Sequence, residues 1–346
     1  MTSTSARRPR IVIGVLLTAC VAAVVLSVAV GSVAISPVRV ISVLAAHLTP
    51  WSGGHAGNGL DDEIVWEFRL PRALLGLLVG AALSVAGAVL QALVRNPLAD
   101  PFVFGVSSGA SVAAVAALTL VTGLAATVST SVAAFVGALV TTLLVFLIAQ
   151  RGGRVTPSRL VLTGVAMSYL LSSITSYLVL RSSGPQGGVQ QVLSWLAGSL
   201  AAARWTDLGL PALVLVTAVF VLVLLARILD AFLTGDETAA SLGVDVGRVR
   251  LVLFVITSLL VGVVVAVSGS IGFVGLVVPH AVRLVIGSGH RWVLPAAALA
   301  GGLLLVVVDT AARLILAPSE VPVGFLTAVI GAPFFLWLLR RSGRAA

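Results

Sequence analysis

Histidine and carboxylate side chains in one short segment could form a metal site. His47 and His55 lie close to the acidic run Asp61, Asp62 and Glu63, and imidazole and carboxylate groups are common metal ligands. Their separations fit no ligand-spacing pattern, and the glycine-rich stretch around His55, SGGHAGNG, is typical of a solvated loop. We therefore predict no metal site here, and no pattern elsewhere predicts a catalytic residue or a bound cofactor.

Ionisable side chains inside the apolar stretches could instead couple transport to an ion gradient, because ion-coupled carriers usually place such a residue within the helix bundle. His280 could relay protons, but no acidic residue is near it in the sequence. Asp309 and Arg313 are four residues apart, the spacing of a local ion pair on one helix face. Gln91 is an uncharged amide that suits a hydrogen bond between helices. No residue stands out as a coupling group.

The basic residues exclude one enzymatic class. All 21 of them are arginine, and there is no lysine. A Walker A loop needs its lysine to reach the phosphates, so the chain is not a nucleotide-hydrolysing enzyme of that type. A transporter without a coupling residue or a nucleotide site takes its energy from a separate ATPase. An ion-coupled secondary carrier that works alone is the alternative from another class.

Composition gives the fold class. Hydrophobic residues make up 59% of the chain, charged residues 10%, and the mean hydropathy is +1.16, whereas a soluble domain carries about 25% charged residues. These values predict an all-α integral membrane protein with about ten transmembrane helices of roughly twenty residues each. The net charge of +9 fits the arginine-rich cytoplasmic loops of membrane proteins better than a nucleic-acid partner. Cys20, the one cysteine, lies in an apolar run and is expected to pack there.

The hydropathy pattern predicts one transmembrane domain, residues 11–341, between a cytoplasmic N-terminus (1–10) and a cytoplasmic tail (342–346). Its first apolar run is longer than that of a signal peptide. An outer loop is expected at 36–68, a cytoplasmic region at 229–250, and an interfacial helix at 193–205 with Trp195 and Trp205 at headgroup level. The ten predicted spans are 11–35, 72–93, 101–121, 126–149, 159–180, 207–228, 251–268, 272–286, 294–312 and 323–339.

The stretch Arg69–Ala113 is predicted to form a helical hairpin around which the rest of the bundle is arranged. Its first arm is apolar and rich in Gly, Ala and Ser, which lets neighbouring helices approach closely. Asn96-Pro97 predicts the turn, and Asp100 before Pro101 predicts a helix N-cap.

Arginine distribution sets the predicted orientation. With both termini inside, fifteen arginines fall on the cytoplasmic side and six on the outer side, a clear positive-inside bias. The outer six are Arg39, Arg69, Arg72, Arg181, Arg204 and Arg313.

The cytoplasmic region 229–250 predicts a short capped helix. Gly235 ends the preceding helix, and Asp236 and Glu237 suit a helix N-terminus, where the dipole favours negative charge. Gly243 suits its C-terminal stop, and Asp245 can cap the next span. Such a compact element is either a docking surface for a soluble partner or a merely interfacial helix.

Several ordered motifs from about Val65 to Arg341 resemble the permease subunits of type II ABC importers for iron–siderophore complexes and vitamin B12, the FecCD-type permeases. Together these motifs are highly specific. They are RLPR at 69–72, GAALSVAGAVLQALVRNPLADPFVFGVSSGA at 80–110, WLAGSL at 195–200, SLGVDV at 241–246, GSIGFVGLVVPHAVRL at 269–284 and PVGFLTAVIGAPFFLWLL at 322–339.

The resemblance implies a ten-helix bundle and several partners. These are a second permease, identical or paralogous, two cytoplasmic ABC ATPase subunits, and an extracytoplasmic substrate-binding protein. It implies ATPase coupling through the helix at 233–246, and docking of the binding protein on exposed arginines. The implied coupling residues are Gly235, Asp236, Glu237, Ser241, Leu242 and Gly243, and the implied docking residues are Arg69, Arg72 and Arg313.

A translocation path for bulky complexes needs small and hydroxyl side chains, and two predicted spans supply them. The same residues could equally serve close helix packing. The candidate path residues are Ser168, Ser172, Thr175, Gly324, Thr327 and Gly331. The sequence thus predicts a multi-pass permease of the cell (inner or plasma) membrane that imports ferric siderophores, or alternatively cobalamin or haem.

Overall fold

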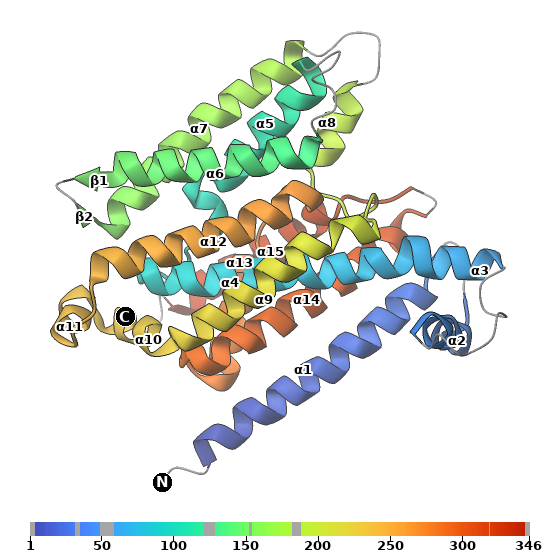
Figure 1. Cartoon of the computed structure of the whole chain (residues 1–346), viewed down its shortest axis with the longest axis horizontal. Helices are drawn as coiled ribbons and strands as arrows, with labels where there is room; N and C mark the ends of the chain where they lie inside the picture. The colour runs from blue at the N-terminus through green and yellow to red at the C-terminus, as the bar shows by residue number, and fades with distance from the viewer. Residues whose placement is uncertain are drawn as a thin grey trace.

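The computed structural model describes residues 4–31, 35–48, 59–120, 129–151, 154–181, 188–317 and 319–342. In this part of the chain the fold is almost entirely helical, with one two-stranded hairpin (Figure 1). The helices are α1 (Thr4–Ala29), α2 (Pro37–Leu48), α3 (Leu60–Glu63), α4 (Leu70–Val94), α5 (Val106–Leu120), α6 (Thr130–Ala149), α7 (Pro157–Arg181), α8 (Gly188–Leu196), α9 (Gly209–Leu224), α10 (Ala226–Thr234), α11 (Asp236–Ser241), α12 (Val246–Ser268), α13 (Val274–Ile286), α14 (His290–Ile315) and α15 (Val323–Ser342). The strands are β1 (Gln150–Arg151) and β2 (Arg154–Val155).

Each of the ten predicted spans contains most of a helix, although several ends differ. Among the described residues, seven helical segments are long and apolar enough to cross a membrane: Arg7–Ala29, Leu60–Val94, Thr130–Ala149, Pro157–Arg181, Trp205–Leu224, Val246–Ser268 and His290–Ile315. The other three predicted spans correspond to the shorter apolar helices α5, α13 and α15. The all-α membrane architecture is therefore confirmed.

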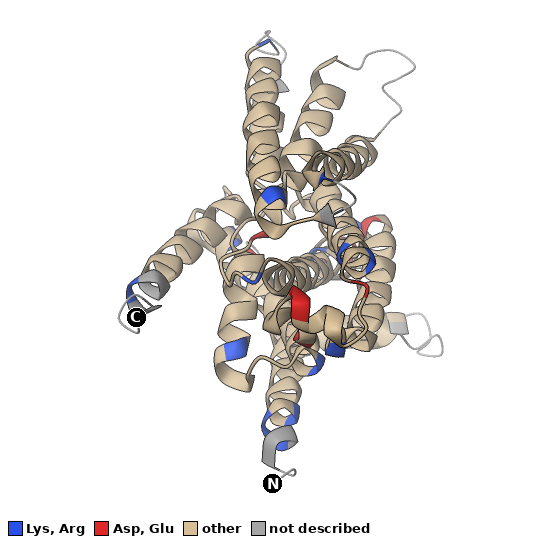
Figure 2. Ribbon diagram, turned by 90° about the vertical axis from the view of Figure 1, so that its left-hand side faces the viewer, with Lys and Arg blue, Asp and Glu red and all other residues tan. Residues whose placement is uncertain are grey.

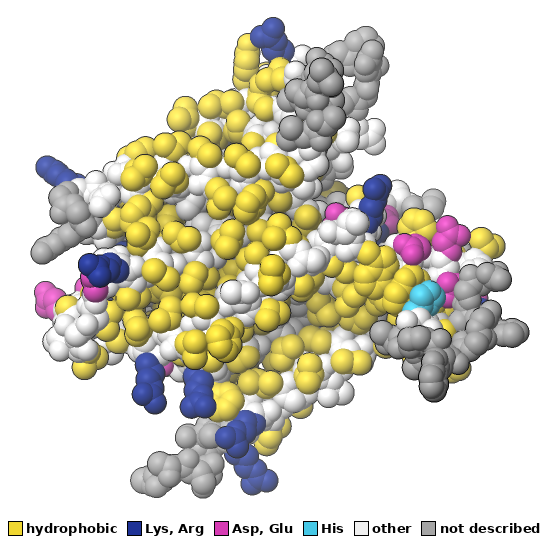
Figure 3. Space-filling view, in the orientation of Figure 1, with side chains coloured by type: hydrophobic (Ala, Val, Ile, Leu, Met, Phe, Trp, Pro, Cys, Tyr) yellow, Lys and Arg dark blue, Asp and Glu magenta, His cyan; other side chains and the backbone are white. Residues whose placement is uncertain are grey.

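Short elements gather at the two opposite ends of the long helices (Figure 1). One end carries the start of α1, the β1–β2 hairpin and α11, and we call it the α11 end. The opposite end carries α2, α3 and α8, and we call it the α2 end. Figure 3 shows apolar side chains covering the middle of one face, with charged side chains gathered toward its margins. This is the surface expected of a protein that spans a bilayer.

Helix α4 forms the centre of the bundle and is buried along nearly its whole length. It packs chiefly on α14, α12 and α13. Small residues make these contacts possible: a Cβ atom on Gly80 would overlap the backbone of Gly301, and one on Gly87 would overlap the backbone of Gly275. The predicted close packing around this arm is confirmed, because backbones in contact leave no room for side chains.

The hairpin turn after α4 is also confirmed, with one difference in its second arm. Arg95 takes a left-handed conformation (φ 56°) at the end of α4, and the Asp100 carboxylate accepts a hydrogen bond of 2.8 Å from the Phe102 amide. The capped element is only a 3₁₀ turn, Pro101–Phe104. Gly105 (φ 78°) then interrupts the helical conformation. The regular helix α5 therefore begins at Val106 and is shorter than predicted.

The prediction of an outer loop at 36–68 is wrong for most of its described residues. Helix α2 buries Val40 and Val43 against Val28 of α1 and Val65, and residues 60–69 form helical turns that continue into α4. The reason is amphipathicity: a helix with one apolar face gains stability by packing that face on the bundle. His55 lies outside the described residues.

The interfacial helix predicted at 193–205 is wrong in its extent. Helix α8 ends at Leu196, and a turn leads from it to α9. Trp205 is partly buried, and its indole nitrogen donates to the Trp66 carbonyl at 2.9 Å. The predicted span at 207–228 is interrupted at Leu225, where α9 gives way to α10.

We predict that Gly87→Val destabilises the folded protein by about 3 kcal/mol, because a larger side chain must push α4 away from α13. The measurement is thermal unfolding of the purified chain in detergent. Gly14→Val is the matched control, since Gly14 on α1 is exposed and a Cβ there meets no atom within 4 Å. Equal unfolding temperatures for both variants would contradict the packing argument.

Candidate functional site

The α11 end presents a short helix whose boundaries match the prediction. Gly235 (φ 117°) separates α10 from α11, and Gly243 (φ 82°) ends it. Val244 N bonds to Ala239 O at 3.1 Å and Gly243 N to Ala240 O at 2.9 Å, the two bonds of a Schellman stop. The Asp245 carboxylate then accepts from Arg248 N at 3.1 Å and caps α12.

The predicted coupling residues therefore sit together on one projecting element. Glu237, Ser241, Leu242 and Gly243 are exposed, and the Leu242 side chain is 69% exposed. This leucine lies at the α11 end, beside an acidic helix turn, and not in the apolar middle of the molecule. An exposed leucine in that place is suited to contact with another protein rather than with lipid.

Asp236 differs from these exposed residues, because its carboxylate pairs with arginines of this chain. Arg250 of α12 donates to both Asp236 carboxylate oxygens, at 3.0 and 2.9 Å, and Arg95 lies 3.8 Å from the same carboxylate. The Arg250 side chain is 5% exposed and also donates to the Val155 carbonyl of the hairpin. Our reading of the sequence missed both arginines, because only the fold brings them to Asp236. Figure 2, which looks onto this end, shows acidic and basic positions close together.

Gln91 forms the predicted hydrogen bonds between helices. Its amide nitrogen donates to the carbonyls of Gly275 and Leu276, at 3.3 and 3.1 Å, and its oxygen accepts from Arg283. Arg283 also donates to the Ala88 carbonyl at 3.0 Å, so these side chains fasten α13 to α4.

A second set of charged side chains lies at the α2 end, where it joins α4 to α14. Arg72 donates from Nε to both Asp309 oxygens at 3.0 Å and from Nη1 to Glu320 at 3.0 Å. Asp309 is 1% exposed, and Arg313 Nε lies 3.4 Å from it, which confirms the predicted local ion pair.

The expectation that the docking arginines expose their guanidinium groups is wrong. Arg69 and Arg72 are each 8% exposed, and the Arg313 side chain is 9% exposed. Arg69 donates to the Val28 carbonyl at 2.9 Å, and Arg313 donates to Ser27 Oγ at 2.7 Å. In an apolar medium a buried charge must find partners, and the end of α1 supplies backbone carbonyls for them.

Most of the candidate path residues lie within helix packing. Thr175 (7% exposed) and Thr327 (4% exposed) are buried, and their hydroxyls bond to backbone carbonyls of their own helices. A Cβ on Gly324 would overlap the Ala197 carbonyl, and one on Gly331 would overlap the Phe273 side chain. Ser168 is half-buried, and of the six only Ser172 is exposed. The packing alternative therefore accounts for Thr175, Gly324, Thr327 and Gly331 in this structure.

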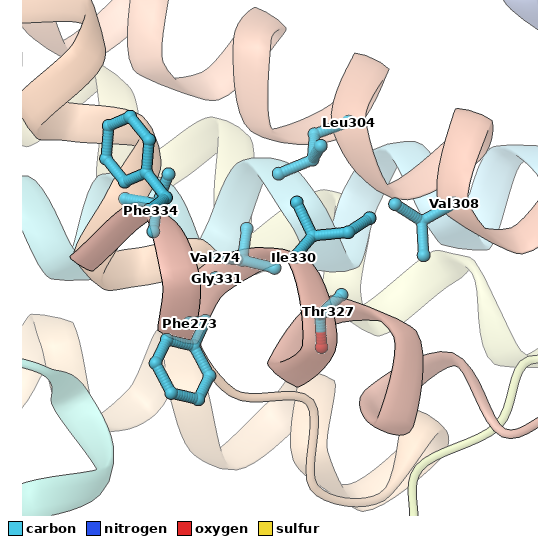
Figure 4. Close-up of a pocket in the computed structure, with 9 residues that line it drawn as sticks. Phe273, Val274, Leu304, Val308, Thr327, Ile330, Gly331 and Phe334 are labelled. Carbon is cyan, nitrogen blue, oxygen red and sulfur yellow. The ribbon is translucent and has the colours of Figure 1, made fainter. Parts of the chain in front are cut away.

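Two of these residues line a small apolar recess between α13, α14 and α15 (Figure 4). Its lining includes Phe273, Leu304, Val308 and Ile330, beside Thr327 and Gly331. The recess has a volume of about 80 Å³, room for a few atoms but not for a bulky chelate.

Helix α7 carries an exposed polar face that lipid does not explain. It is the least hydrophobic of the seven candidate spans, and Ser172, Ser173 and Ser176 are exposed on it beside Tyr169 and Tyr177. Tyr169, at the middle of the helix, is 75% exposed. Tyrosines that face lipid favour the headgroup level, so a polar face at mid-span is suited to a second protein chain or an aqueous path.

Comparison with known proteins gives consistent matches over most of the chain. Residues 18–341 match the FecCD transport family. The chain is 42% identical to the vitamin B12 import system permease protein BtuC of Vibrio cholerae, over 85% of this chain and 87% of that protein. It is 40% identical to the Fe(3+)-citrate import system permease protein YfmD of Bacillus subtilis, over 90% of each.

A solved structure is also similar throughout its length. It is described as a metal-chelate type ABC transporter in an inward-facing conformation. The TM-score is 0.82 with 30% sequence identity, and the match covers 96% of this chain and 99% of the other.

We predict that Asp309→Asn destabilises the protein by about 3 kcal/mol, because it leaves two arginines without their buried counter-charge. Glu320→Gln is the control: Glu320 pairs with the same Arg72 but its side chain is 40% exposed, so its loss costs about 1 kcal/mol or less. Thermal unfolding in detergent measures both, and the burial argument fails if the two losses are equal.

Proposed function

The chain belongs to the FecCD transport family and is a permease subunit, and on that premise we propose that it carries metal-chelate cargo within an ATP-driven importer. The observation that carries the proposal is the projecting element at the α11 end. It combines a short helix bounded by glycines with the exposed Leu242, and it lies at the end of the molecule rather than in its apolar middle. A carrier that works alone needs no such docking surface.

Two ABC ATPase subunits are the partners that we propose for this element. The chain has no lysine for a Walker A loop, so hydrolysis takes place in other chains. Glu237, Ser241, Leu242 and Gly243 offer the contact surface, whereas Gly235 and Asp236 shape and hold the helix. With the ATPases at the α11 end, that end is cytoplasmic, in agreement with the arginine bias.

A second permease, identical or paralogous, is proposed to cover the polar face of α7. The translocation path then runs at the interface between the two permeases. Ser172 is retained as a path residue, and the exposed Tyr169, Ser173, Ser176 and Tyr177 belong beside it.

A substrate-binding protein is proposed to dock at the α2 end, which faces away from the cytoplasm. Direct pairing with Arg69 and Arg313 requires these buried side chains to change partners. Arg72 is buried as well, but one of its two carboxylate partners, Glu320, is 40% exposed. A carboxylate of the docking protein can take the place of Glu320 and keep the arginine paired.

Ferric-siderophore complexes are the cargo that we propose. The Fe(3+)-citrate permease matches over a larger share of both chains than the vitamin B12 permease, although the identities are similar. The similar solved structure is described as a metal-chelate type transporter. Cobalamin and haem import are the alternatives within the family.

We predict gene-dependent uptake of labelled ferric siderophores that stops on ATP depletion and survives collapse of the ion gradient. The measurement is cellular uptake with and without the gene, with labelled cobalamin in parallel. Uptake of cobalamin alone would change the cargo and keep the mechanism. Uptake that is lost only with the ion gradient would establish a secondary carrier instead.

We predict that Leu242→Asp lowers the amount of co-purifying ATPase by about tenfold, because an apolar anchor of an interface is replaced by a charge. The assay is affinity purification of the tagged permease from cells that express its ATPase. Leu60→Asp is the matched control, since Leu60 is 79% exposed at the opposite end. The docking proposal is wrong if Leu242→Asp retains the ATPase.

A further inference from the structure

Helix α11 has little of its own to hold it in place. It contains six residues, and Ala239 is the buried one among them. The Schellman bonds close its C-terminal end, whereas Gly235 at its N-terminus provides no side-chain cap. Apart from Ala239 and its neighbours α10 and α12, its position on the bundle depends on contacts made by its first residue.

That residue, Asp236, is held by one buried guanidinium group. The Arg250 Nη2 atom lies 3.0 and 2.9 Å from the two Asp236 oxygens. Arg250 is 5% exposed and the Asp236 side chain is 35% exposed, so the guanidinium end of the pair is shielded from water while the carboxylate end remains accessible. The two bonds are charge-assisted and therefore stronger than neutral ones. Arg95 is a weaker partner of Asp236, because it is 3.8 Å away and its side chain is 43% exposed.

The same guanidinium group reaches the β1–β2 hairpin. Its Nη1 atom donates to the Val155 carbonyl, and its carbon lies 5.8 Å from the centre of the Phe232 ring in α10. A recess of about 330 Å³ separates the hairpin from the first turns of α12, between Val155, Gly247 and Leu251. The hydrogen bonds of Arg250 thus join the hairpin to α11 and α12 at a place where apolar side chains leave a gap.

Val155 lies two residues before the start of α7, the helix with the exposed polar face. We propose that Arg250 is a positioning residue that ties the coupling helix α11 to the start of α7, so that displacement of α11 by the ATPase moves α7. The proposal rests on the proposed function of α11. The planar guanidinium suits this role, because its donors point in fixed directions toward two acceptors at once.

The test uses the full complex of permeases and ATPases in lipid nanodiscs. With Cys20 replaced by alanine, spin labels at Thr238→Cys on α11 and Ser158→Cys on α7, both exposed positions, report the distance between the two helices. We expect a narrow distance distribution with and without ATP in the otherwise unchanged chain, and a broadened, nucleotide-dependent one in Arg250→Gln. Ferric citrate transported per ATP hydrolysed, measured with the same complex and its substrate-binding protein in sealed proteoliposomes, should fall by about tenfold in Arg250→Gln, a typical coupling effect.

Arg248→Gln is the control, because Arg248 lies two residues away and its exposed side chain pairs with Asp245. It should match the unchanged chain in both readouts. Arg250→Lys keeps the charge but not the two-way geometry, so it should retain co-purifying ATPase and still lose coupling, which separates positioning from folding. Unchanged distances and coupling in both Arg250 variants would overturn the inference alone. An unchanged chain that binds no ATPase would instead overturn the proposed function.

Discussion

Close backbone contact around α4 is the constraint on which the rest of the structure depends. In lipid, helices gain little from burying apolar side chains against one another, so they associate through tight packing and hydrogen bonds. Gly80 and Gly87 allow α14 and α13 to approach α4 at backbone distance, and Gln91 and Arg283 add hydrogen bonds between α4 and α13. This closely packed centre holds α12, α13 and α14 around α4.

Buried arginines perform the corresponding task at both ends of the molecule. At the α2 end Arg72 joins α4 to α14 through Asp309, and at the α11 end Arg250 joins α12 to α11 and to the hairpin. Each guanidinium meets a carboxylate, so the desolvated charges compensate one another. Each of these arginines also has a more exposed carboxylate partner, Glu320 for Arg72 and Asp236 for Arg250, and these carboxylates lie where we place the partner proteins.

The described fold therefore separates a packed centre from exposed functional elements. Helix α11 presents Leu242, and α7 presents hydroxyl and aromatic side chains at mid-span. Neither surface is explained by contact with lipid, and the complex of permeases and ATPases that we propose would give each of them a partner.

The sequence by itself determined the membrane class, the ten helical segments and the local signals at chain reversals. The Asp100 cap, the glycine boundaries of α11 and the Asp309–Arg313 pair were all predictable, because each depends on residues only a few positions apart. The tertiary structure alone decided what long-range packing controls. It placed α2 on the bundle, buried Arg69 and Arg72, and turned Thr327 and Gly331 into packing residues. It also brought Arg250 to Asp236 and Val155, which lie 14 and 95 positions away in the chain. No local sequence pattern predicts these contacts of Arg250, because they depend on how separate helices are arranged in space.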